Sequence, residues 1–111
     1  MPRILVPVED KSGIDARIAD HFNRAPYYAI VEVDERLEVK RIGFIENPRH
    51  RGLNPAEYFT GFNIDLVIVR RSAGSKAIEP LKSRGTRVLS CNSMTIAGAL
   101  REIREGKAIE L

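Results

Sequence analysis

The run Leu66-Val67-Ile68-Val69 constrains the fold of this chain more than any other feature. Three of these large apolar side chains are β-branched and no polar residue alternates with them, so the run predicts a strand that is buried on both faces. Such strands are typical of the middle of a parallel sheet covered by helices. In open α/β sheets, ligands bind beyond the carboxyl ends of the central strands. We therefore expect functional groups directly after Val69.

The segment that follows, Arg70-Arg71-Ser72-Ala73-Gly74-Ser75, suits an anionic ligand. It offers two guanidinium groups, two hydroxyls and a glycine, and a guanidinium fork can hold phosphate, sulfate or an anionic cluster bidentately. Because side chains alternate along a strand, Arg70 and Arg71 should point to opposite faces, and we expect Arg71 on the ligand side. The alternative is that both arginines only solubilise a loop.

Two further apolar runs, residues 4–8 and 86–91, predict strands beside the central one. Pro7 cannot donate a hydrogen bond to a neighbouring strand, so the pairing should be interrupted there or face an edge. Because residues 4–8 and 66–69 are both continuously apolar, both require central positions. We predict that residues 66–69 lie between residues 4–8 and residues 86–91.

Residues 27–33 and 38–45 predict a β-hairpin. In its second strand Val39 falls out of step with Ile42 and Phe44, which predicts a bulge. Together with the three parallel strands, the hairpin gives a five-stranded mixed sheet flanked by helices, which is an α/β fold.

Capping residues predict where the helices lie. The clearest start is Asn54-Pro55-Ala56-Glu57, with Asn as the cap, Pro at the first helical position and Glu three residues after the cap. Pro80 should kink its helix, unless the first turn of that helix is irregular. Gly85 and Gly106 follow the last residues of two predicted helices, as C-terminal stops do. The predicted helices cover residues 16–20, 54–62, 75–84 and 94–105.

Length and charge exclude several classes of protein. The 111 residues are expected to form one domain, 1–111, and the net charge of +3 is too small to indicate nucleic acid or a membrane as a partner. No apolar run approaches the roughly 18 residues of a membrane span. A single cysteine, Cys91, cannot form an internal disulfide. We expect a cytoplasmic protein.

Several segments resemble one known family. The opening strand, the segment Asp20-His21-Phe22-Asn23-Arg24-Ala25-Pro26-Tyr27 and the tripeptide Glu46-Asn47-Pro48 resemble proteins of dinitrogenase iron–molybdenum cofactor biosynthesis. The resemblance extends over essentially the whole chain. It departs from the family at Asn23, where Gly is usual, and in residues 70–77, where the family has a glycine-rich loop.

This resemblance implies a ribonuclease H-like fold and a cofactor-related role. Family members related to NifX and to the C-terminal domain of NifB bind or carry iron–molybdenum cofactor or its iron–sulfur precursors. The resemblance and the strand-end chemistry together suggest a set of cofactor-binding residues. These are His21, Arg24, His50, Arg71, Ser72, Gly74 and Ser75.

His21 and Cys91 are the candidate metal ligands. A neutral imidazole is a good ligand for iron or zinc, and a thiolate at a strand end could ligate an iron–sulfur species. Each has a structural alternative: His21 as a hydrogen-bonded residue at a helix end, and Cys91 as a small buried hydrophobe. No Cys-x-x-Cys or His/Cys spacing indicates a closed metal site.

Arg24 and His50 also have two interpretations. Arg24 could contact an anion or fork onto a carboxylate or carbonyl groups within the fold. His50, flanked by Arg49 and Arg51, could be exposed loop or a flap that adds charge and an imidazole to the site.

We conclude from the sequence that the chain is a non-catalytic carrier or assembly accessory for an anionic metallocofactor, working with a partner protein. Enzyme signatures are weak: Gly74-Ser75-Lys76 lacks the glycines of a phosphate loop, and no serine has an obvious His/Asp partner. The alternative function is a regulatory or interaction module that binds a partner protein or a small phosphorylated ligand. A nuclease relic is a third possibility.

Overall fold

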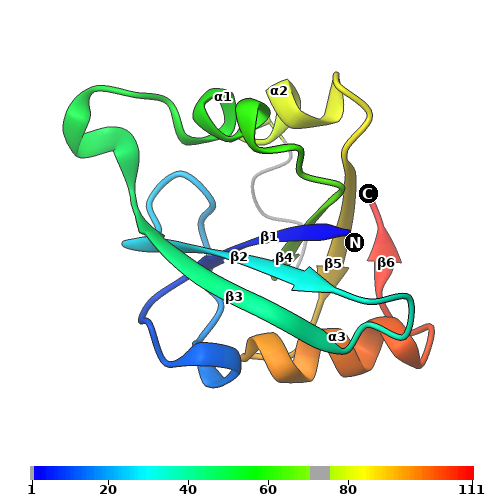
Figure 1. Cartoon of the computed structure of the whole chain (residues 1–111). Helices are drawn as coiled ribbons and strands as arrows, with labels where there is room; N and C mark the ends of the chain where they lie inside the picture. The colour runs from blue at the N-terminus through cyan, green and yellow to red at the C-terminus, as the bar shows by residue number, and fades with distance from the viewer. Residues whose placement is uncertain (1, 71–75) are drawn as a thin grey trace.

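The computed structural model describes residues 2–70 and 76–111, and its centre is a six-stranded mixed sheet (Figure 1). The strands lie in the order β3-β2-β1-β4-β5-β6. β1, β4 and β5 are parallel to one another, and the other strands pair antiparallel with their neighbours. The bounds are β1 Arg3–Val8, β2 Tyr27–Val33, β3 Val39–Glu46, β4 Leu66–Arg70, β5 Arg87–Cys91 and β6 Ile109–Glu110.

The prediction of five strands is wrong, because the chain returns after α3 (Ile96–Arg104) and adds β6 beside β5. β6 has only two residues, too few to give an apolar period in the sequence. It pairs with residues 89–90 of β5, and Glu110 forms an ion pair with Arg87 (2.8 Å). Both side chains of that pair are exposed, so the backbone pairing holds β6 more than the charges do.

The central position of β4 is confirmed. β4 lies between β1 and β5, with Ile4 paired to Leu66 and Leu66 to Arg87. Val67 and Ile68 are fully buried. Burial on both faces explains why the run has no polar alternation.

The pairing of β1 changes partner near Pro7, as predicted. β4 pairs with the beginning of β1, and residues 17–19 take its place farther along. The Ala19 amide donates to the Pro7 carbonyl (2.8 Å), and the Glu9 amide donates to the Arg17 carbonyl (2.8 Å). The N and C=O of one residue point to the same side of a strand, so the Pro7 nitrogen, which carries no hydrogen, points toward residues 17–19 and not toward β2. The hydrogen bonds between β1 and β2 therefore lose no donor at Pro7.

Residues 16–20 do not form the predicted helix. A 3₁₀ helix, Gly13–Asp15, comes first, and its cap residues make no side-chain hydrogen bond to it. Ala16 and Ile18 are both buried, which is the period of a strand, and Ile18 bridges to Val8. Burial of these two side chains against β1 therefore outweighs the weak helical signal.

Helices lie over both faces of the sheet (Figure 1), and buried side chains form one layer on each face. α3 covers one face, whereas α1 (Pro55–Phe59) and α2 (Glu79–Lys82) cover the other. Along β4, Ile68 belongs to the first layer, and Val67 and Val69 belong to the second. We call them the α3 layer and the α1–α2 layer.

Caps and proline set the helix ends. Asn54 caps α1, as predicted, by accepting from the Glu57 amide (3.1 Å), and the chain continues as a 3₁₀ helix over Thr60–Phe62. α2 is shorter than the predicted helix 75–84, because Pro80 lies in its first turn, where no amide is needed. Within residues 2–70 and 76–111, no helix is long and apolar enough to cross a membrane.

The predicted bulge and the last helix are confirmed with small changes. The pairing of β2 with β3 shifts between Glu32 and Val33, and Val33 pairs with Val39. α3 starts two residues later than predicted, because Thr95 caps it by accepting from the Gly98 amide (3.1 Å).

Candidate functional site

Asn47 joins the two motif segments that carry the family resemblance. Its side-chain amide donates to the carbonyls of Asn23 (2.9 Å) and Ala25 (2.7 Å). The buried Tyr28 hydroxyl donates to the carbonyl of Phe22 from below. These bonds satisfy the backbone of a loop that lacks regular structure, and they therefore fix the position of residues 22–25.

A polar hollow of about 530 Å³ opens between this loop and the start of α1. Two of its lining residues, Arg24 and Arg49, carry positive charge. The Arg49 guanidinium also donates to the Asn23 carbonyl (3.3 Å), so the cation is held against the loop. We call this the basic hollow, and it is lined by Asn23, Arg24, Arg49, Gly52, Leu53, Asn54 and Pro55.

Asn23 brings an unsatisfied polar atom to the basic hollow. Its side-chain Oδ1 is buried and has no hydrogen-bond partner among the residues that the structure describes. A buried polar atom without a partner is costly, and such atoms are concentrated at binding sites. Oδ1 is an acceptor and does not itself bind an anion, so what suits an anionic ligand is the pair of guanidinium groups, Arg24 and Arg49, in a lining without a carboxylate.

His50 does not line the basic hollow. Its Nδ1 contacts the Asn47 carbonyl, and its Nε2 lies 3.9 Å from a carboxylate oxygen of Glu46. The imidazole is thus turned back onto its own loop and remains largely exposed. The flap-like role of His50 stays a prediction.

Arg70 and Asp20 connect the end of β4 to the loop that begins with His21. Arg70 Nη1 lies 2.9 Å from Asp20 Oδ1. The Arg70 side chain is only 15% exposed, and its buried Nε has no partner within the described part of the chain. His21 itself is exposed, next to this pair in sequence. The ion pair therefore positions the start of the loop at the carboxyl end of the central strand.

The other predicted strand-end residues are Arg71, Ser72, Gly74 and Ser75, and they lie outside the described residues. Their role in anion binding stays a prediction. The described end of β4 supports only the position of Arg70.

Cys91 is buried in the α3 layer, with Sγ facing the Ala99 carbonyl (3.9 Å). Burial, with a smaller contribution from Glu102, raises the pKa of the Cys91 thiol to about 11. Ala19 and Phe22, which flank His21, belong to the opposite layer. Cys91 is thus enclosed in the core whereas His21 is exposed, and their role as metal ligands stays a prediction. No group of three or more His, Cys, Asp or Glu that could hold a metal occurs in the described ranges.

Sequence reasoning missed Arg49, Asn47 and Asn23 as site residues. In the sequence, Arg49 stands out only as a neighbour of His50. The preceding Asn47-Pro48 indicates a tight turn, and this turn is the signal that could have placed the Arg49 side chain against residues 22–25. Arg24 was predicted, and the structure places it with Arg49 in one hollow.

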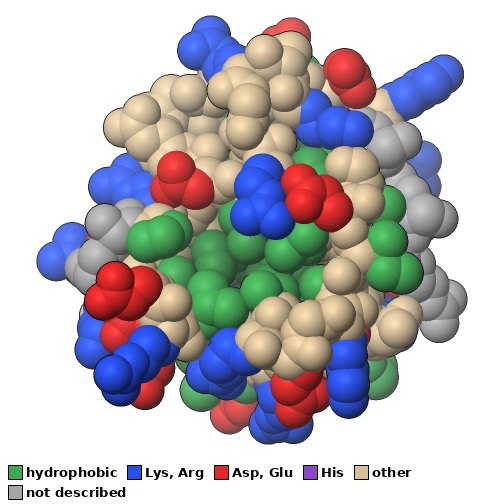
Figure 2. Space-filling model, turned by 90° about the vertical axis from the view of Figure 1, so that its right-hand side faces the viewer, with side chains coloured by type: hydrophobic (Ala, Val, Ile, Leu, Met, Phe, Trp, Pro, Cys, Tyr) green, Lys and Arg blue, Asp and Glu red, His purple; other side chains and the backbone are tan. Residues whose placement is uncertain are grey.

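A different, apolar groove of about 520 Å³ lies at the amino ends of the parallel strands. Its floor includes Ile4, Leu66 and Leu89 from three neighbouring strands, and Ile103 of α3 and Leu37 of the hairpin turn form its walls. Figure 2 shows this side of the molecule, where hydrophobic side chains gather in the middle and charged ones surround them. The charged residues of its lining are Asp65 and Arg87, and Arg87 is paired with Glu110, so the groove differs from the basic hollow in being mainly apolar.

Comparison with known proteins identifies relatives of the whole chain. The family model described as dinitrogenase iron-molybdenum cofactor matches residues 2–106. No curated protein matches the sequence significantly.

Three solved structures have closely similar folds. The crystal structure of PH0822 is 25% identical, covers 98% of this chain and 96% of its own, and gives a TM-score of 0.76. A candidate NifB protein from Thermotoga is 22% identical, with 100% and 94% coverage and a TM-score of 0.77. The apo form of the orange protein from Desulfovibrio gigas is 20% identical, with 100% and 93% coverage and a TM-score of 0.78.

Proposed function

We propose that this chain, which belongs to the dinitrogenase iron-molybdenum cofactor family, binds an anionic metal–sulfur cluster as its cargo and carries it without chemical change. The cargo is iron–molybdenum cofactor or an iron–sulfur precursor, delivered to a partner protein of cluster assembly. The observation that carries the proposal is the basic hollow, whose lining includes Arg24 and Arg49 and no carboxylate.

Charge and geometry support a cluster as the ligand. Guanidinium groups present several donors in a plane, which suits the sulfide and oxide surface of an anionic cluster. Arg24 is exposed and has no ion-pair partner in residues 2–70 and 76–111, so its charge is available. Arg49 is held by the Asn23 carbonyl and pre-positioned, which lowers the entropic cost of binding.

The remaining predicted residues complete the proposed site. His21 is proposed to supply an exposed imidazole from the loop before Asn23, and His50, which does not line the hollow, is proposed to turn from its own loop to add a second one. Arg71, Ser72, Gly74 and Ser75 are proposed to extend the site at the end of β4. Cys91 would have to leave the core before it could bind metal, so its burial favours the structural role.

The predictions on domain organisation, fold family, catalysis and location are proposed here as the sequence suggested them. We propose one domain over residues 1–111, with the ribonuclease H-like fold that the family resemblance implies. A cytoplasmic, non-catalytic protein fits a carrier of clusters, and no nucleic acid or membrane is proposed as a partner.

Anaerobic titration with tetrathiomolybdate, read by its absorbance, tests the proposal. Arg24→Gln and Arg49→Gln should each weaken binding about tenfold, and the loss should shrink in high salt because exposed charges are screened. The matched control is Arg101→Gln, which removes the same charge from the exposed side of α3.

Three results would contradict the proposal. These are no saturable binding, equal losses in Arg101→Gln and the two hollow variants, or full retention in the double variant. A parallel titration with an iron–sulfur cluster assembled from ferrous iron and sulfide distinguishes the two classes of cargo. His21→Ala is expected to release the cluster more readily while the free energy of unfolding changes by less than about 1 kcal/mol.

The alternative function, a regulatory module for a small phosphorylated ligand, has one observation in its favour. A second polar hollow, with an arginine of its own, lies at the other end of α1.

A further inference from the structure

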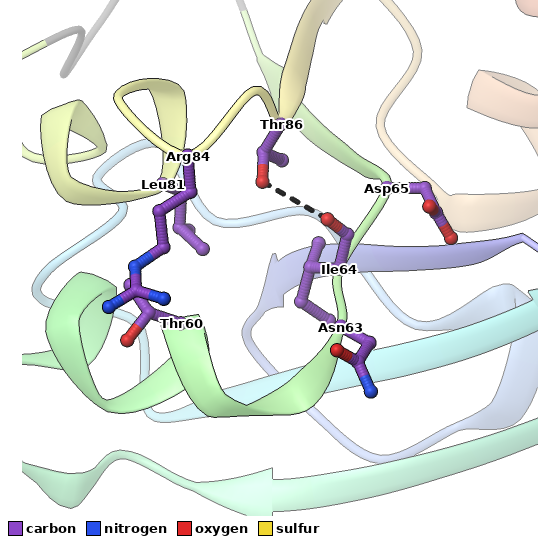
Figure 3. A pocket seen from close by; sticks show the side chains of 7 residues that line it. All are labelled: Thr60, Asn63, Ile64, Asp65, Leu81, Arg84 and Thr86. Atoms are coloured by element: carbon purple, nitrogen blue, oxygen red, sulfur yellow. Dashed lines mark hydrogen bonds between the residues drawn. The ribbon is translucent and has the colours of Figure 1, made fainter.

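The second polar hollow, of about 300 Å³, lies between the 3₁₀ helix after α1 and the turn after α2 (Figure 3). We call it the Arg84 hollow. The basic hollow includes Asn54 and Pro55 at the start of α1, whereas this one begins at Thr60, directly after its end. It is lined by Thr60, Asn63, Ile64, Asp65, Leu81, Arg84 and Thr86.

Arg84 is the only cation in the lining, and its charge is uncommitted. No hydrogen bond or ion pair of its guanidinium group occurs within the part of the chain that the structure describes. In Figure 3 the guanidinium reaches back from the turn after α2 toward the hydroxyl of Thr60. A cation that lines a hollow without a carboxylate partner is available to an anion.

Two neutral polar groups share the hollow with Arg84. The Thr60 hydroxyl donates to the Glu57 carbonyl (2.6 Å), so its oxygen lone pairs remain free. Asn63 has a left-handed backbone (φ 55°), and its side-chain amide has no hydrogen bond among the described residues. Figure 3 places Asn63 on the other side of Ile64 from Arg84, so the polar groups flank an apolar floor.

The only acid of the lining is turned away. The Asp65 carboxylate accepts from the Arg3 amide (2.8 Å), and in Figure 3 it points away from Arg84. Thr86 is also committed, because its hydroxyl donates to the Ile64 carbonyl (3.0 Å) and closes the floor. The groups that remain available to an anion are therefore the cation and the Asn63 amide, because the Thr60 oxygen can only accept hydrogen bonds.

We propose that the Arg84 hollow binds a small oxyanion, namely free phosphate or the phosphate or carboxylate group of a metabolite. Arg84 supplies the charge, Asn63 the donor on the opposite wall, and Ile64 and Leu81 the apolar contact. This site goes beyond the carrier role, because it shares no lining residue with the basic hollow.

Titration of the ¹⁵N-labelled protein with inorganic phosphate, followed by amide chemical shifts, tests the inference. Phosphate should shift the amides of residues 60–65 and 84–86 along saturable curves. Arg84→Gln should weaken this response at least tenfold, and Arg104→Gln, an exposed control on α3, less than twofold. A parallel titration with acetate asks whether the hollow prefers a tetrahedral or a planar anion, and saturable binding of either supports the inference.

The inference is overturned if neither anion gives saturable shifts at residues 60–65, or if Arg84→Gln responds as the unmodified chain does. Arg24→Gln separates the two hollows. It should leave the phosphate response of residues 60–65 intact, whereas loss of that response would assign phosphate to the basic hollow and not to Arg84. Failure here leaves tetrathiomolybdate binding at Arg24 and Arg49 unaffected, so the two proposals fail independently.

Discussion

The two layers that cover the sheet are built from different side chains. The buried members of the α3 layer are aliphatic apart from Cys91, whereas the α1–α2 layer contains a chain of aromatic rings. Tyr28 lies between Phe22 (5.2 Å between ring centroids) and Phe59 (5.0 Å), and Phe59 reaches Phe62 (5.1 Å). Both polar hollows also adjoin this second layer. One face of the sheet is thus covered by a mainly aliphatic layer alone, and the other also adjoins the groups that we propose to bind ligands.

Truncation of one large side chain in each layer should separate these roles. Phe59→Ala and Leu100→Ala should each lower the free energy of unfolding by about 3–5 kcal/mol, because both remove a buried side chain and leave a cavity. Only Phe59→Ala should also weaken tetrathiomolybdate and phosphate binding, since Pro55 of α1 lines the basic hollow and Thr60, which follows Phe59 directly, lines the Arg84 hollow. Urea unfolding and the two titrations measure the difference, and equal binding in both variants would break the comparison.

The pH dependence of stability should reveal the burial of Cys91. Its folded pKa of about 11 lies above the ordinary value of 9.0, so between these two pH values the unfolded chain has lost a proton that the native chain retains. Stability is then fully present below pH 9 and falls as pH rises toward 11, by about 2–3 kcal/mol in total. Urea unfolding at pH 8, 9, 10 and 11 measures it.

Cys91→Ala is the control for that experiment, because titration of lysines and tyrosines affects both proteins alike. The difference in stability between the two chains should shrink over this range. A constant difference would mean that the thiol is not protected by the α3 layer.

The loop anchor on the other face should give the smallest effect. Asn47→Ala removes the donors to the Asn23 and Ala25 carbonyls and should cost about 1–3 kcal/mol, because those carbonyls lose their partners. It should also weaken tetrathiomolybdate binding, since Arg49 and Asn23 lose their fixed position. Thr95→Ala, which removes the cap of α3 and lines neither hollow, should cost about 1 kcal/mol and is the matched control. An effect of Asn47→Ala on binding no greater than that of Thr95→Ala would refute the anchoring role.

The sequence predicted the fold best where burial is regular. The period of residues 96–104 and the unbroken run of β4 located α3 and the sheet centre, because each signal extends over a full element. Short elements gave no such signal: β6 has two residues, and α2 has four. The false helix at residues 16–20 arose because a strand-like bridge to β1 depends on a contact that is distant in sequence.

The candidate site could be predicted only in part, for a related reason. Arg24 lies in a motif, so the sequence could indicate its role in binding an anion. Arg49 is brought to the hollow by a hydrogen bond to the carbonyl of Asn23, which is distant in the sequence, so no local pattern indicates its role. Asn23 lacks a partner because of how the loop folds, which composition and spacing do not encode. The sequence indicates only that Arg84 ends the predicted helix 75–84. Its hollow also needs residues 60–65, which precede β4 and are distant from Arg84 in the sequence.

The strand order has a consequence for how the chain folds. β2 and β3 meet across a short turn, so their hairpin can form from local contacts within microseconds. The pairing of Ile4 with Leu66, in contrast, joins two residues that are far apart in the sequence, with the whole hairpin between them. Such non-local parallel pairing is slow because the entropy of loop closure comes first. Arg70 therefore reaches Asp20 only after β1 and β4 have joined, and we expect the contact between this strand end and the loop that begins with His21 to be assembled late, on a scaffold whose hairpin is already in place.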